Sequence, residues 1–198
     1  LSVERATPSI HSEVFHLVSL GEGVMYSSAA ITFHIGGAPL QEFKIRVPKE
    51  IETVEFTGAD IEGWTRDGET CTVRLQSKIM GDYNLLVTFD KQFDPDRAEI
   101  AVAGIETTGT ESEVGYVALA SSASLSLKEA VPLPPSMQKI HREEIPAEYT
   151  APVQDPIITA YRYVKAPHRA LIRVQPYRTD QLLDQVVDCV KLETQVSK

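Results

Sequence analysis

The sequence has little of what marks several specialised classes of protein. Only two cysteines occur in 198 residues, so disulfides do not provide the framework of the fold. No apolar run approaches the roughly 18 residues that a membrane-spanning helix requires. Basic residues number 19 against 28 acidic ones and form no cluster, and we therefore expect no nucleic-acid partner. A conventional hydrophobic core must hold this chain together.

The sequence also lacks the motifs by which common catalytic and cofactor-binding sites are recognised. It contains no G-x-S-x-G nucleophile turn, no Walker A loop and no G-x-G-x-x-G opening a helix. Its histidines form no H-x-H or H-x-x-x-H pair of the kind that binds zinc; they are His11, His16, His34, His141 and His168. We predict no catalytic residue, no cofactor and no enzymatic activity.

What the sequence does contain is a two-residue alternation of apolar side chains. It is clearest at Tyr83, Leu85, Val87 and Phe89, and this period is typical of a half-buried β-strand. Weaker copies span residues 14–20, 24–35, 43–47, 51–56, 61–65, 69–76, 98–105 and 114–120, with turn signals such as Asp67-Gly68 between them. The pattern predicts an all-β fold, an antiparallel β-sandwich of immunoglobulin-like or related type, with less than about a fifth helix.

Proline divides the predicted organisation into three parts. Residues 1–129 form the β-sandwich, and residues 130–156 hold half of the twelve prolines and are predicted to be a connector. Residues 157–198 are predicted to form a β-hairpin and a terminal strand, as a smaller β-rich part that belongs to a second, truncated module. Within these parts, 136–145 fits either a short helix or an extended connector, and 179–190 fits either a helix or a strand.

The two cysteines allow two interpretations. Cys71 alternates with Val73 and Leu75, which is the pattern of a small buried strand residue. A disulfide between Cys71 and Cys189 would need an oxidising compartment. The sequence leaves both interpretations open.

Two groups of residues are candidates for binding. Trp64, Tyr161 and Tyr163 could present aromatic rings to a carbohydrate, although Tyr161 and Tyr163 share one strand face, and such a pair more often packs a sheet against its neighbour. A second group has the carboxylates that calcium prefers, but its spacing is not that of an EF-hand, and a solvated acidic turn explains it as well. This second group consists of Asp90, Asp94, Asp96 and Glu99.

The order of short motifs resembles the β-sandwich modules of large bacterial cell-envelope proteins. The motifs are the strands at 31–35, 43–48 and 54–58, the pair Gly63-Trp64, the turn Asp67-Gly68 and the segment 81–85, with 115–119 as the strand before the proline-rich part. The resemblance covers about the first two thirds of the chain and brings no catalytic residues. It implies a multi-module parent protein in the periplasm or on the cell surface.

Two functions are compatible with these observations. The first is a non-catalytic structural or interaction module, whose partners are other modules of the same polypeptide or envelope proteins. The alternative is a carbohydrate- or ligand-binding accessory module of an envelope enzyme or receptor. Exposure of the candidate rings would favour the alternative, and their burial would oppose it.

Overall fold

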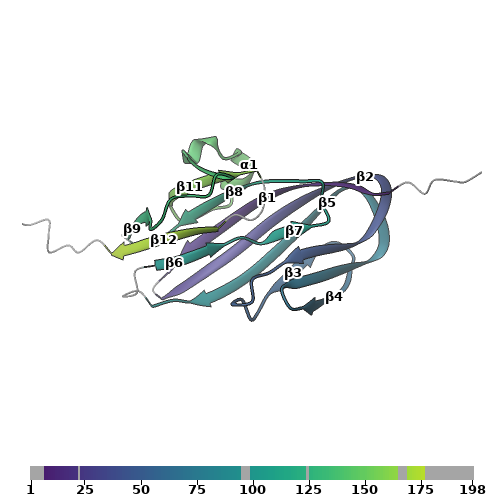
Figure 1. Cartoon of the computed structure of the whole chain (residues 1–198), viewed down its shortest axis with the longest axis horizontal. Coiled ribbons are helices and arrows are strands. Elements are labelled where there is room, and N and C mark those ends of the chain that lie inside the picture. Colours follow the sequence, from purple (N-terminus) through teal and green to yellow (C-terminus); the bar gives the residue numbers. More distant parts are fainter. Residues whose placement is uncertain (1–6, 22, 95–98, 124, 165–168, 177–198) are drawn as a thin grey trace, which may run out of the picture.

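The computed structural model describes residues 7–21, 23–94, 99–123, 125–164 and 169–176 (Figure 1). Strands make up 69% of these residues and helices 4%, which confirms the predicted all-β fold. The elements, in chain order, are β1 (Ser9–Leu20), β2 (Val24–Arg46), β3 (Glu55–Gly58), β4 (Ile61–Asp67), β5 (Thr70–Gln92), β6 (Glu99–Ala103), β7 (Glu106–Thr108), β8 (Ser112–Ala120), β9 (Leu125–Glu129), β10 (Met137–Ile140), the 3₁₀ helix η1 (Arg142–Glu144), α1 (Ala147–Thr150), β11 (Ile157–Tyr163) and β12 (Arg169–Pro176).

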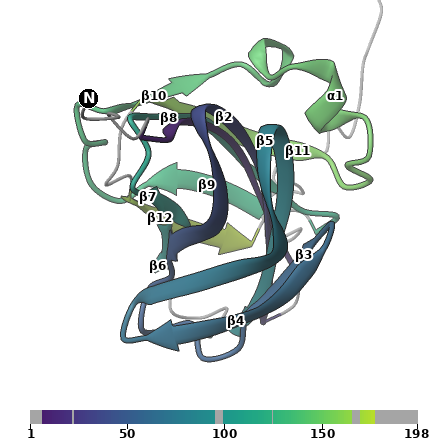
Figure 2. The same ribbon diagram turned by 90° about the vertical axis from the view of Figure 1, so that its right-hand side faces the viewer.

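Two strands of 23 residues each, β2 and β5, run through both layers of the sandwich. They pair antiparallel along nearly their whole length, and their register shifts between Ile35 and Glu42, where both strands curve over (Figure 2). Gly37 and Gly81 lie in this bend with φ of +73° and +90°, which residues with a Cβ rarely adopt. The sequence predicted that strands would end at these glycines. The strands instead bend there and continue.

The bends divide the strands between two layers. The first layer has the order β10-β11-β8-β1-β2-β5-β3, while β4 pairs with β5 and β7 with β2 beyond the bend. A three-stranded sheet, β6-β12-β9, packs on the same core. Most pairs are antiparallel as predicted, but β1 and β8 are parallel, so the larger sheet is mixed.

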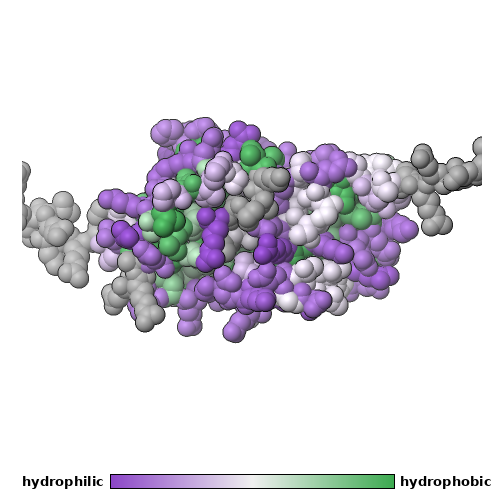
Figure 3. Space-filling view, viewed as in Figure 1, coloured by the Kyte–Doolittle hydropathy of each residue, from purple (hydrophilic) through white to green (hydrophobic). Residues whose placement is uncertain are grey.

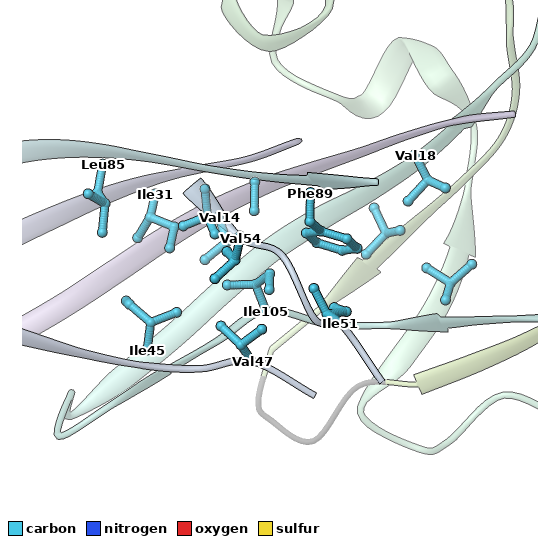
Figure 4. Packing of buried hydrophobic residues seen from close by; sticks show 14 of the residues in the cluster. Val14, Val18, Ile31, Ile45, Val47, Ile51, Val54, Leu85, Phe89 and Ile105 are labelled. Atoms are coloured by element: carbon cyan, nitrogen blue, oxygen red, sulfur yellow. The ribbon is translucent and has the colours of Figure 1, made fainter. Parts of the chain in front are cut away.

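The hydrophobic core lies between the layers. Figure 4 shows Ile31 and Leu85 of the first layer pointing toward Ile45 and Val47 of the second. These four side chains are each no more than 1% exposed. Burying an aliphatic side chain of this size contributes roughly 2 kcal/mol, so the interlayer contact is the main source of stability.

The strands of the C-terminal part belong to the same sheets as those of residues 1–129. Strand β11 lies between β10 and β8, and β12 lies between β6 and β9. The hairpin predicted over residues 157–175 is therefore corrected: both strands exist, but they pair with other strands and not with each other. Long-range pairing determines this arrangement, and a strand pattern alone does not contain it.

The proline-rich segment is packed against the sheet. It contains β10, η1 and α1. Of the two alternatives for residues 136–145, the single short helix is not found, and an extended strand followed by one 3₁₀ turn takes its place. Residues 141–153, called the cover segment below, lie over the outer face of the first layer, which is the face directed away from the core. There Ile145 joins a second hydrophobic cluster with Phe15, and the ring of Tyr149 stacks on Phe15 with centroids 5.2 Å apart.

Cys71 is a free cysteine buried in the core, as its alternation with Val73 predicted. Burial raises the pKa of its thiol. Cys189, the 179–190 segment and the predicted terminal strand lie outside the described residues. In the part of the chain that is described, no helix has the length and apolar character to span a bilayer.

Candidate functional site

The outer face of the first layer is covered at one side and open at the other. The cover segment lies over β10, β11, β8 and part of β1. Beyond it, an open groove with a volume of about 360 Å³ crosses β1, β2, β5 and the start of β3. Small-molecule sites have volumes of about 300–1,000 Å³, so the groove is large enough to hold a ligand.

Strand register brings the side chains of this groove into two rows. In the first row, Leu17 of β1 lies opposite Ser28 of β2, Ser28 opposite Thr88 of β5, and Thr88 opposite Glu55 of β3. In the second, Ser19 lies opposite Tyr26, and Tyr26 opposite Asp90. Residues that are direct partners on adjacent strands share a face, so both rows face the same way. The groove is therefore built from rigid strands.

The polar side chains of the groove are unpaired within the described part of the chain. No hydrogen bond or ion pair joins those of Ser19, Tyr26, Ser28, Thr53, Glu55, Thr88 or Asp90 to another described residue. The opposite end of the same face differs, because its polar side chains bond to one another. His34 Nδ1 lies 2.8 Å from Asp82 Oδ1, and Thr32 donates to Asn84 at 2.9 Å. The two ends of this face therefore differ in whether their polar side chains are paired with described residues.

The groove also has a distinct electrostatic and aromatic character. Of the residues that the structure describes, the only charged ones lining it are Glu55 and Asp90, both acidic. Tyr26 is 58% exposed, although β2 is otherwise largely packed. Exposed tyrosine combines a flat apolar ring with a polar hydroxyl. On the face of the molecule shown in Figure 3, hydrophobic residues form separate patches among hydrophilic ones.

The aromatic residues predicted as a binding platform do not come together. Tyr161 and Tyr163 are each 1% exposed and belong to the core, so neither ring can stack on a sugar. Trp64 on β4 is 41% exposed, and its ring meets that of Phe56 edge-on at 5.1 Å. It does not line the groove.

The predicted calcium ligands are dispersed where they are described. Asp90 faces the groove on β5, whereas Glu99 begins β6 in the other sheet and pairs with Arg173 at 2.9 Å. Asp94 is exposed, and Asp96 lies outside the described residues. No three His, Cys, Asp or Glu side chains of the described ranges form a group that could hold a metal ion. The complete four-residue site stays a prediction.

One exposed cluster brings together the residue types of a catalytic triad. Ser112 Oγ lies 2.8 Å from His11 Nδ1, and His11 Nε2 lies 3.6 Å from Glu111 Oε2. The second distance is too long for a hydrogen bond, and half of the His11 side chain is exposed to water. A catalytic base needs an orienting partner and a sheltered site, so this cluster has the geometry of surface hydrogen bonding.

A buried polar network joins the two layers near β7. The Glu113 carboxylate accepts hydrogen bonds from the backbone N–H of Thr107 at 2.6 Å, from the Thr107 hydroxyl and from the Tyr163 hydroxyl. The Thr107 hydroxyl also lies 2.7 Å from that of Ser12. Burial raises the pKa of Glu113 despite these bonds. The buried Tyr163 of β11 thus has Glu113 as its polar neighbour in the core.

Replacing Glu113 with alanine should lower the free energy of unfolding by about 2–3 kcal/mol, because buried donors on Thr107 and Tyr163 lose their acceptor. Replacing it with glutamine should largely preserve stability.

Since the folded-state pKa of Glu113 is raised, the contribution of protonated Glu113 to the free energy of unfolding is complete below the unfolded pKa of 4.5. This contribution is lost as the pH rises through the folded-state pKa. Urea unfolding of wild type, Glu113→Ala and Glu113→Gln at pH 4 and above measures the free energy of unfolding and checks both predictions. The part of its decline with rising pH that is due to Glu113 should be absent in Glu113→Gln.

Comparisons with known proteins identify no family for this chain. No protein-family model matches it, and no curated protein does. The M1 zinc metallopeptidase from Deinococcus radiodurans shares 10% sequence identity with a TM-score of 0.43, over 86% of this chain and 42% of that chain. A mutant of the same enzyme also shares 10% identity, with a TM-score of 0.41 over 86% and 43%. This chain therefore spans less than half of those chains, and the likeness concerns the coarse fold alone.

Proposed function

We propose that this chain is a non-catalytic binding module of a larger bacterial protein located outside the cytoplasm. In this proposal the module attaches its parent to another component of the cell envelope. The location rests on the resemblance of its short strand motifs, such as Gly63-Trp64, to envelope β-sandwich modules. The binding role rests on the outer face.

The observation that carries the binding role is the asymmetry of that face. The cover segment protects one side through the stack of Tyr149 on Phe15. The other side keeps an open groove whose polar side chains have no partners among the described residues. The backbone beneath these side chains is already ordered by strand pairing, so a ligand has to order side chains but no loop, which favours recognition at this place.

The alternative function has lost its original support. It placed a carbohydrate on Trp64, Tyr161 and Tyr163, and two of these three rings are buried. The predicted site needed either Trp64 or the pair Tyr161 and Tyr163 at the surface, and only Trp64 is exposed, with its ring against Phe56. The groove is the better position for any ligand.

Photo-cross-linking in cells that make the full-length protein tests the binding role. With p-benzoylphenylalanine in place of Ser28, in the groove, we expect a specific adduct on irradiation. The matched control is the same replacement of Met80, which is 59% exposed at the bend and outside the groove. Equal adducts from both positions, or none from Ser28, would contradict the proposal. Fractionation of the same cells tests the compartment, and a purely cytoplasmic parent would contradict it.

A further inference from the structure

We infer that the groove binds a neutral carbohydrate chain. This inference rests on the proposed function and names the ligand class for the same site. It follows from three properties of the groove: its shape, its charge and the chemistry of its unpaired side chains. Each can be compared with what competing ligands would require.

The shape of the groove suits an extended ligand. The first row crosses four strands, from Leu17 on β1 to Glu55 on β3. Three strand spacings correspond to roughly 14 Å, which is long enough for more than one sugar ring. The second row runs beside it through Ser19, Tyr26 and Asp90. A chain of linked rings could therefore contact both rows along its length.

The charge of the groove excludes one class of ligand. Among the described residues that line it, Glu55 and Asp90 are the only charged ones, and none is a lysine, arginine or histidine. A phosphate, sulfate or uronate would meet two carboxylates with no compensating cation. The ligand is therefore neutral or positively charged.

The side-chain chemistry separates these two remaining cases. Hydroxyls are the most numerous polar groups in the groove, and each both donates and accepts a hydrogen bond. A ligand rich in hydroxyls uses both capacities, whereas an ammonium group only donates. The exposed Tyr26 ring adds an apolar surface on which the C–H face of a sugar can pack. Together these features match a neutral sugar better than an amine.

Calorimetric titration of the purified 198-residue chain tests the assignment. The neutral probes are cellohexaose, maltohexaose and hexa-N-acetylchitohexaose, each to about 10 mM, because a Kd in the millimolar range is still measurable there. Hexalysine and hexagalacturonate serve as the cationic and anionic comparisons. We expect saturable binding of at least one neutral hexaose and no comparable binding of either charged ligand.

Variants connect the binding to the groove. Tyr26→Ala should weaken binding about tenfold through the loss of ring contact, while Tyr26→Phe should remain within about twofold. Trp64→Ala is the matched control, since it removes an exposed aromatic ring outside the groove and should leave affinity unchanged. Unchanged circular dichroism spectra and unfolding midpoints show that each variant remains folded.

The outcomes distinguish this inference from the proposed function. Binding of no neutral hexaose, binding of hexalysine alone, or equal binding by Tyr26→Ala and wild type would overturn the carbohydrate assignment. If cross-linking from Ser28 still succeeds in cells, the binding module stands and only its ligand class is wrong. If both experiments fail, the groove is not a binding site.

Discussion

Replacing Gly115 with alanine is expected to lower the free energy of unfolding by about 3 kcal/mol, at the upper end of what overpacking costs. A Cβ at this position would lie 2.6 Å from the carbonyl oxygen of Val14 and 2.6 Å from the Tyr163 hydroxyl. The Val14 carbonyl belongs to β1, the parallel neighbour of β8, so it cannot move without disturbing the ladder between them. Urea denaturation followed by circular dichroism measures the loss.

The control is Gly63→Ala on β4, where an added Cβ would meet no atom within 4 Å. That change should alter stability by less than about 0.5 kcal/mol. The added Cβ would also lie 2.7 Å from Cζ of the Tyr163 ring. Comparing the double variant Gly115→Ala, Tyr163→Leu with Tyr163→Leu alone removes both ring contacts and keeps the carbonyl contact, so it separates the two causes. A Gly115→Ala protein as stable as wild type would show that the two strands are not so closely packed.

Acid is expected to destabilise the protein through His16. This side chain is 1% exposed on the core face of β1, and burial lowers its pKa from 6.5 to about 4. Because the folded-state pKa is depressed, the contribution of neutral His16 is complete above pH 6.5 and is lost as pH falls through about 4. The full difference corresponds to about 3 kcal/mol. Glu50 and Lys91 line the small cavity beside His16. Both must therefore stay unchanged in any variant that is compared with the wild type.

The variant His16→Leu isolates this effect. Neither ring nitrogen of His16 has a hydrogen-bond partner among the described residues, so leucine removes a polar group without breaking a bond. The stability of the variant relative to wild type should increase by about 3 kcal/mol between pH 7 and pH 4. His11→Gln, which changes an exposed histidine, should follow the wild-type pH profile. Parallel profiles for wild type and His16→Leu would show that His16 does not control acid stability.

The strands were predictable from sequence because half-burial leaves a period of two. Tyr83, Leu85, Val87 and Phe89 are all buried on β5, with exposed residues such as Asn84 and Leu86 between them. The bend at Gly37 and Gly81 was not predictable, since a glycine that ends a strand and one that bends it look the same locally. The difference lies in whether β2 and β5 keep pairing beyond it.

Pairing partners and the groove depend on contacts between distant residues. Nothing near Tyr161 or Tyr163 indicates that β11 lies between β10 and β8. Both rings are buried because this face of β11 packs in the core, where Tyr161 donates to Glu129 of β9. Alternation places Tyr26 and Ser28 on the solvent side of β2, but only the position of the cover segment decides that this part of the face stays open. The sequence therefore indicates which residues face outward and leaves undecided which of them remain accessible.

The parallel pairing of β1 with β8 has a consequence for biosynthesis. His11 and Ser112 are neighbours in the sheet although 101 positions separate them in the chain. As the ribosome extends the chain, β1 can pair with β2 early. The backbone groups on its other edge have no partner strand until β8, which begins at Ser112, has emerged. An unfilled strand edge is a template for pairing with another chain. The nascent protein thus passes through a long interval in which one edge of its central strand is open to pairing with another chain.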